Sequence, residues 1–223
     1  MKKILVSIIS LVSAVTGLMA QGQPYTREKE WAKEIGAFAE IDQKQSPPEK
    51  PIVFTGSSTI RLWATLREDF PNQRVMNRGF GGSRLDDLVF FAPKIVAPYK
   101  PKMIVVYSGE NDIEANESPE NVLSDFKAFI AFRDKELPKT PIVYICMKPS
   151  ILRWALWPAM KKGNDLIKAE IPHHKNVRSV DVSSSMLGPN ESKPSPEIFQ
   201  PDGLHLNAKG YAILRAALLP YLK

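Results

Sequence analysis

Cysteine is almost absent from this sequence: Cys146 is the only one among 223 residues, and it lies in an apolar run typical of a buried strand. One cysteine cannot form a disulfide within the chain, which excludes a disulfide-stabilised scaffold. Histidine is scarce too, with three in all, and the adjacent His173 and His174 could not both face one ion from a helix. No group of cysteine, histidine and carboxylate residues has the spacing of a metal site, so we predict none.

Long runs of one charge are also absent. The formal net charge of +6 falls to +4 without the leading lysines, Lys2 and Lys3. Elsewhere lysine and glutamate are interspersed, which is typical of a solvated surface and not of a nucleic-acid-binding face. We therefore expect no nucleic-acid partner.

Only the N-terminus carries a long apolar run. Lys2 and Lys3 precede apolar residues from Ile4 to about Met19, and small residues follow at 20 and 22, before Gln23. This pattern predicts a signal peptide over residues 1–22, a mature domain over 23–223, and a secreted or periplasmic protein. A membrane anchor is the alternative, but the run is short for a span of about 20 residues. No other segment is apolar enough, so we expect no membrane span in the mature chain.

Strand-like and helix-like segments alternate along the rest of the chain. Apolar, β-branched runs predict strands at 51–55, 74–77, 102–107, 141–146 and 177–182. Helical periodicity predicts helices at 25–43, 60–69, 84–97, 119–136, 154–170 and 208–222. Continuous apolar strands between helices indicate a parallel sheet covered on both faces. The predicted fold class is α/β, a three-layer α/β/α sandwich around a five-stranded parallel sheet.

Polar residues and glycines follow the predicted strands. The segments are TGSST at 55–59, NRGFGGS at 77–83 and SGEND at 108–112, and a long connection after the fifth strand ends in Asp202 and His205. Ligands of parallel α/β sheets bind beyond the carboxyl ends of the strands. These segments together hold hydroxyls, glycine amides, an amide side chain and an acid–histidine pair, which is the set that acyl transfer needs.

Each segment also has a simpler interpretation. Residues 56–58 could be a strand-to-helix turn with a capping serine, and residues 111–112 could be ordinary turn residues. Residues 79–82 could be a flexible turn or a phosphate loop, although Arg84 breaks the G-x-G-x-x-G pattern. Asp202 and His205 could belong to a solvated loop with Asn207 as an N-cap. Alternatively, Asp202 could accept the Nδ1 hydrogen of His205 and leave Nε2 free, as in a serine-hydrolase triad.

The strings IVFTGSSTIRLW, NRGFGGS, YSGENDI and PDGLHLNAKGY, in this order, resemble blocks I, II, III and V of the SGNH (GDSL-type) hydrolase superfamily. The bacterial branch similar to platelet-activating-factor acetylhydrolases is the best match, and the resemblance covers about residues 48–222. It implies a flavodoxin-like SGNH hydrolase fold with five site residues: Ser58, Gly82, Asn111, Asp202 and His205. One departure is that the middle position of the Gly-Asp-Ser string holds a serine, residue 57. The G-x-S-x-G elbow of α/β-hydrolases is absent.

The resemblance implies a serine esterase. Ser58 would be the nucleophile, His205 the base and Asp202 its partner, while Gly82 and Asn111 would help to bind the oxyanion. No cofactor is needed. The expected substrate is a small-molecule or polysaccharide ester that carries an acetyl or other short acyl group, on a carbohydrate or small lipid.

Other interpretations stay open at this point. They are a catalytically silent carbohydrate-binding exoprotein on the same fold, a lysophospholipase or thioesterase of the same family, and a phosphate- or nucleotide-binding flavodoxin-like domain. The loops after the first four strands are predicted to be short, and the connection 183–201 is too polar to form an apolar lid. We therefore expect an open, polar cleft. Trp154 and Trp157 could line it, although their helical spacing is more typical of a covered face.

Overall fold

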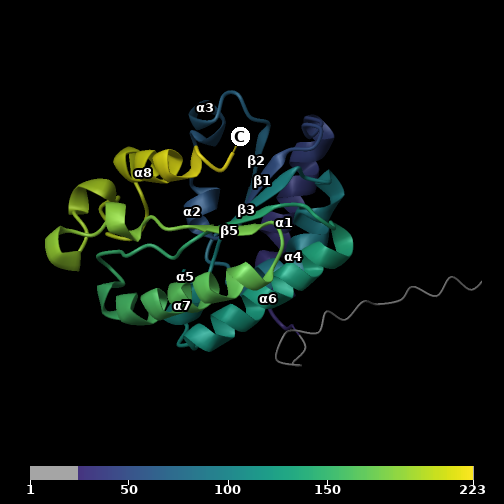
Figure 1. Ribbon diagram of the computed structural model, residues 1–223. Coiled ribbons are helices and arrows are strands. Elements are labelled where there is room, and N and C mark those ends of the chain that lie inside the picture. Colours follow the sequence, from purple (N-terminus) through teal and green to yellow (C-terminus); the bar gives the residue numbers. More distant parts are fainter. Residues whose placement is uncertain (1–24, 223) are drawn as a thin grey trace, which may run out of the picture.

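A five-stranded parallel sheet lies between two layers of helices in the computed structural model, which describes residues 25–222 (Figure 1). The predicted signal peptide, residues 1–22, lies outside the described residues. The strands are β1 (Ile52–Gly56), β2 (Val75–Gly79), β3 (Met103–Tyr107), β4 (Ile142–Ile145) and β5 (Val177–Val180). Their order is β2-β1-β3-β4-β5. This is the flavodoxin-like order, in which ligands bind at the switch point between β1 and β3.

The α-helices cover both faces of the sheet. They are α1 (Glu28–Lys44), α2 (Ser58–Arg61), α3 (Leu66–Asp69), α4 (Leu85–Ile95), α5 (Glu110–Glu114), α6 (Pro119–Glu136), α7 (Trp157–Glu170) and α8 (Ala208–Leu218). In Figure 1, α6 and α7 lie below the sheet, and α3 and α8 lie above it. The predicted three-layer sandwich is confirmed.

The hydrophobic core has two halves because strand side chains alternate between the faces of a sheet. Val53 and Ile104 point into the half covered by α4, α6 and α7. Phe54 and Val105 point into the half covered by α2, α3 and α8. The predicted apolar stripe of α1, which includes Trp31, packs against the first half beside α4.

The single helix predicted over 60–69 is wrong. Helix α2 ends at Arg61 and α3 begins at Leu66. Between them Trp63 is buried against Phe54, with ring centroids 5.9 Å apart, and its Nε1–H donates to Asp69 over 2.7 Å. These contacts stabilise a turn instead of a continuous helix. Helix α6 has its predicted bounds, and α8 ends four residues before residue 222.

The connection from β4 to α7 is longer than predicted. Helix α7 begins only at Trp157, after a short 3₁₀ turn, η2 (Trp154–Leu156), so residues 146–153 form an irregular segment, of which residues 146–150 are buried. The side chain of Asn164 accepts from the amide of Met147 and donates to its carbonyl, over 2.8 and 2.9 Å. The backbone of Met147 is thus satisfied by a side chain of α7 and not by a strand or helix of its own.

The connection from β5 to α8 is long, as predicted. It contains the short 3₁₀ turns η4 (Ser183–Ser185), η5 (Pro189–Glu191) and η6 (Pro196–Ile198). Met186 and Phe199 are buried, and none of the large apolar side chains that the described residues expose lies between 183 and 201. The other 3₁₀ turns are η1 (Ala97–Tyr99) and η3 (Ile171–His173). None of the helices within residues 25–222 has the length and apolarity to span a membrane.

Candidate active site

The register of the three central strands brings the candidate residues to one edge of the sheet. Gly56 at the end of β1 pairs with Gly79 of β2 on one side and with Tyr107 of β3 on the other. Ser58, Gly82 and Asn111 follow these strand ends by two, three and four residues. The loops that carry them therefore start side by side.

A sharp turn presents Ser58. Gly56 has a φ of +116°, and a Cβ there would lie 1.9 Å from the carbonyl oxygen of Tyr107, so only glycine fits. The amide of Ser57 donates to that same oxygen over 2.9 Å. The chain then enters α2, whose first residue is Ser58. The close approach of β1 and β3 thus fixes the direction of the turn.

His205 contacts both Ser58 and Asp202. Its Nε2 lies 3.1 Å from Ser58 Oγ, and its Nδ1 lies 2.6 Å from Asp202 Oδ2. Ser57 is buried and Ser58 is half-buried. Of the two serines, the structure places the hydroxyl of Ser58 against the imidazole. The three side chains come from segments up to 147 residues apart in the chain.

Asp202 is held in an ionised state by its own loop. Its Oδ1 accepts from the amides of Leu204 and His205, each over 2.9 Å. Desolvation opposes ionisation, but the hydrogen bonds from the His205 side chain and from these two amides outweigh it and lower the pKa of Asp202 to about 2. The predicted N-cap is also present, since the side chain of Asn207 accepts from the amides of Lys209 and Gly210.

Gly82 and Asn111 lie in the loops after β2 and β3, and a hydrogen bond ties these loops together. Gly82 is exposed with a φ of +75°, a conformation that favours glycine. Asn111 Nδ2 donates to the carbonyl of Ser83 over 2.9 Å, which leaves a second amide hydrogen. Within the described part of the chain, the backbone amides of Ser58 and Gly82 donate to no other group. These N–H groups could therefore donate to a bound ligand.

A network of charged side chains contacts Asn111 on the side of its Oδ1 atom. Arg153 donates from Nη1 to Asn111 Oδ1 over 2.9 Å and lies 3.6 Å from Glu110 Oε1. Glu110 also pairs with Lys148 over 3.1 Å and accepts from the hydroxyl of Tyr107. Burial and the carboxylate of Glu110 raise the pKa of Tyr107 well above its usual value, so this tyrosine stays a donor.

The model of the GDSL-like Lipase/Acylhydrolase family matches residues 52–213. The chain belongs to this family. The match runs from β1 into α8 and includes all five predicted site residues. The protein is therefore an acylhydrolase that acts on ester bonds, and the predicted resemblance to GDSL-type hydrolases is confirmed.

This acylhydrolase is similar to two named proteins and to one solved structure. It is 25% identical over 191 residues to platelet-activating factor acetylhydrolase IB subunit alpha2 of Gallus gallus, which covers 82% of this chain and 79% of that protein. It is 24% identical over 208 residues to a protein of Bacillus subtilis (strain 168) provisionally named a peptidoglycan O-acetyltransferase. That match covers 91% of this chain but only 29% of the relative. A structure from Streptococcus pneumonia, provisionally named a platelet activating factor, gives a TM-score of 0.76 at 22% identity, over 87% of this chain and 94% of that one. This last likeness supports the fold.

The sequence of this acylhydrolase indicated no role in the site for Arg153, which lies in the segment after β4. The amides of Ile151 and Leu152 donate to the carbonyl of Gly203, over 3.0 and 3.1 Å, and the next residue, Arg153, reaches Asn111. The segment therefore links the loop of Asp202 and His205 to the loop of Asn111. Leu152 is 64% exposed beside this edge.

Trp154 and Trp157 belong to the covered face, the more typical of the two interpretations. Trp157 is buried, and Trp154 packs as a partly buried side chain against the core half that contains α6 and α7. Within residues 25–222, neither tryptophan forms a hydrogen bond with Ser58 or His205.

Proposed function

We propose that this acylhydrolase is a serine esterase with Ser58 as nucleophile, His205 as base and acid, and Asp202 as the group that orients His205. The observation that carries the proposal is the double contact of His205, 3.1 Å to Ser58 Oγ and 2.6 Å to Asp202 Oδ2. A hydroxyl linked through an imidazole to a carboxylate is the arrangement that activates serine in many hydrolases.

The reaction has two halves. Ser58 Oγ attacks the acyl carbonyl carbon while its proton passes to His205 Nε2, and a tetrahedral oxyanion forms. The intermediate collapses, the C–O bond to the alcohol breaks, and His205 returns the proton to the leaving alkoxide. Water then attacks the acyl-serine and loses a proton to His205. The second tetrahedral intermediate collapses, the bond from the acyl carbon to Ser58 Oγ breaks, and His205 returns the proton to Ser58 Oγ, so that the carboxylic acid is released and free Ser58 is restored. Asp202 stabilises the imidazolium in both halves because it stays ionised.

The oxyanion is assigned to three donors: the backbone amides of Ser58 and Gly82 and the free Nδ2 hydrogen of Asn111. The two amides are unused within residues 25–222, and Asn111 keeps one hydrogen beyond its bond to Ser83. Each such donor typically contributes about 10²–10³ to kcat. Arg153 polarises the carboxamide of Asn111 from its oxygen side, which strengthens Nδ2 as a donor.

The substrate class we assign is an acetyl or other short-acyl ester of a carbohydrate or small lipid. The names of both relatives concern acetyl groups, one as an acetylhydrolase and one as an O-acetyltransferase of peptidoglycan. The connection 183–201, which ends at the candidate site, exposes no large apolar side chain and so offers no apolar lid. The N-terminal basic and apolar pattern favours action outside the cytoplasm, as a secreted or periplasmic enzyme.

An ester panel tests this function. The purified protein is assayed on p-nitrophenyl esters of increasing acyl length, on acetylated sugars and on lysophospholipid micelles, with Ser58→Ala as the inactive control. We expect hydrolysis of acetyl esters, a steep fall beyond about four to six acyl carbons, and no rise at the micelle threshold, because a small pocket cannot bury further CH₂ groups. Rates that climb with chain length, or jump when micelles form, would instead indicate a lipase.

A further inference from the structure

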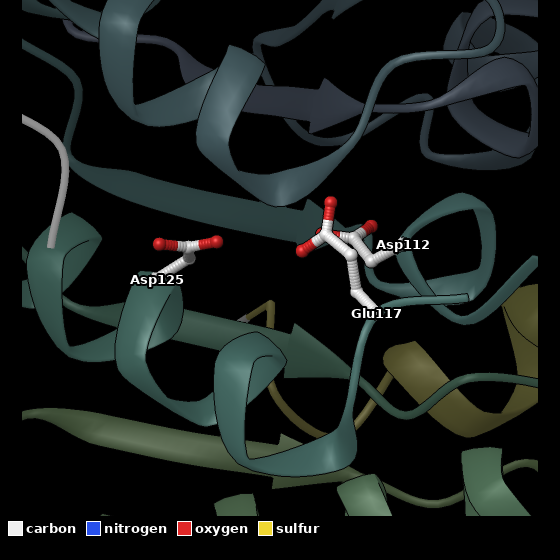
Figure 2. Close-up of side chains that lie close together, drawn as sticks. All are labelled: Asp112, Glu117 and Asp125. Carbon is white, nitrogen blue, oxygen red and sulfur yellow. The ribbon is translucent and has the colours of Figure 1, made fainter. Parts of the chain in front are cut away.

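Three carboxylates lie close together next to the candidate active site. None of them is among the groups assigned to ester hydrolysis. Asp112 lies on α5, Glu117 lies in the turn after it, and Asp125 lies on α6. Figure 2 shows their side chains facing a common region from these three places. Each offers one oxygen, and the three oxygens lie within 4.8 Å of one another.

Of the three carboxylates, Asp112 is the one whose contacts indicate a missing ligand. It is fully buried, and its Oδ1 accepts from the amide of Leu85 over 2.9 Å. Its Oδ2 is buried without any hydrogen-bond partner among the described residues. Buried polar oxygens in native proteins nearly always have a partner, and an uncompensated buried carboxylate oxygen is strongly unfavourable. The free oxygen belongs to the same carboxyl group that faces Glu117 and Asp125.

The charges around the cluster do not balance. Asp125 is 4% exposed. Glu117 pairs with Arg84 over 3.1 Å. The guanidinium of Arg27 pairs with Asp87 over 3.1 Å and lies 3.8 Å from Asp86. Arg84 pairs with the cluster through Glu117, and the described residues form no ion pair with Asp112 or Asp125.

We propose that Asp112, Glu117 and Asp125 bind one hard divalent metal cation, with Ca²⁺ as the best fit. Carboxylate oxygens are the ligands that such cations prefer. Ca²⁺–oxygen distances are about 2.3–2.6 Å, so oxygens on opposite sides of the ion lie about 4.6–5.2 Å apart and adjacent ones lie closer. The three oxygens can therefore share one Ca²⁺ ion, with water completing its shell. The ion supplies the partner that Asp112 Oδ2 lacks and offsets the excess negative charge.

The site adjoins the proposed oxyanion donors. Asp112 follows Asn111 directly, and it holds the amide of Leu85, two residues after Ser83, whose carbonyl accepts from Asn111. A bound cation therefore fixes the loops after β2 and β3 against α6. It takes no part in the chemical step, and its effect is on the stability of the fold at this edge.

Calorimetry on the full chain tests the site without substrate. The protein is treated with a chelator, dialysed and titrated with CaCl₂, MgCl₂ or MnCl₂ alone, and its melting temperature is measured with each salt. We expect one Ca²⁺ per chain and a saturable rise in melting temperature. Asp125→Asn removes a ligand charge at nearly constant volume and should weaken Ca²⁺ binding about tenfold or more.

The matched control is Asp134→Asn, the same change on the same helix at a carboxylate that is 60% exposed. It should bind Ca²⁺ as the unaltered chain does. If Asp125→Asn fails to fold, Glu117→Gln takes its place. Absence of binding by all three cations at millimolar concentration, or equal Ca²⁺ binding by Asp125→Asn and the unaltered chain, would overturn the proposal. Esterase activity can persist in either case, so the two proposals fail separately.

Discussion

Arg153 donates to the side-chain oxygen of Asn111 over 2.9 Å, while Nδ2 of the same carboxamide donates to Ser83 over 2.9 Å. The guanidinium has no acceptor, so the group it contacts must be the carboxamide oxygen. The orientation of Asn111 is thereby fixed with its N–H groups on the side away from Arg153.

Removal of Arg153 should lower kcat more than it changes KM. We expect Arg153→Gln to reduce kcat about 10–100-fold on p-nitrophenyl acetate, because the oxyanion donor loses its orientation and polarisation in the transition state. Arg153→Lys should recover part of the loss. Arg215→Gln, at an exposed arginine of α8, is the control and should have no effect. A raised KM with an unchanged kcat would indicate that Arg153 binds substrate instead.

The pH dependence of activity should contain one ionisation on the acid side. An imidazolium cannot accept the serine proton, so kcat/KM should fall with a slope of one towards acid pH. Asp202 adds no second ionisation above about pH 3, because its pKa is lowered to about 2 and it protonates only below that range. Asp202→Asn should reduce kcat by several orders of magnitude, as in triads generally. A flat profile from about pH 5 to 9 with an active Asp202→Asn variant would contradict the assignment of His205.

Leu152 should contribute to acyl-chain preference. It is 64% exposed, and its backbone is bonded to the loop of Asp202 and His205. Leu152→Asp should raise KM for p-nitrophenyl butyrate about three- to tenfold while it changes KM for the acetate little, because only the longer chain reaches apolar surface there. Leu219→Asp, at another exposed leucine, next to α8, is the control. Equal effects on both esters would show that Leu152 does not contact the acyl chain.

The buried pair of Lys148 and Glu110 should be important for stability. Lys148→Met removes the cation at 3.1 Å from Glu110 and leaves its carboxylate with Arg153 and the hydroxyl of Tyr107. We expect a loss of about 3 kcal/mol in the free energy of unfolding, measured by urea denaturation. Lys162→Met breaks an exposed pair with Glu120 and should leave the free energy of unfolding nearly unchanged. If both variants lose the same stability, the buried network does not have the role assigned to it.

The architecture could be predicted because local patterns decide it. Strands such as β3 are uninterrupted apolar runs between helices, a pattern that favours a covered parallel sheet. The strand-end rule then placed Ser58, Gly82 and Asn111 at one edge, and the structure puts their loops side by side. Local patterns could not predict the irregular segment 146–153. The backbone partner of Met147 there is the side chain of Asn164, which is 17 residues away.

The supporting residues of the site could not be predicted for the same reason. Arg153 is one arginine among many in the sequence, and only the long segment after β4 brings it to Asn111, 42 residues away. The acidic cluster was also missed. Asp112, Glu117 and Asp125 are spaced by five and eight residues, which matches no metal-binding pattern, and a turn between α5 and α6 brings them together.

Active-site labelling tests the central assignment, Ser58 as the nucleophile, most directly. The protein is treated with a fluorophosphonate, digested and sequenced by mass spectrometry, with fragmentation used to separate the adjacent Ser57 and Ser58. We predict one adduct, on Ser58, which is lost in Ser58→Ala and retained in Ser57→Ala, because only the Ser58 hydroxyl lies against His205 Nε2, at 3.1 Å. An adduct on Ser57, or labelling that survives in Ser58→Ala and disappears in Ser57→Ala, would contradict the account.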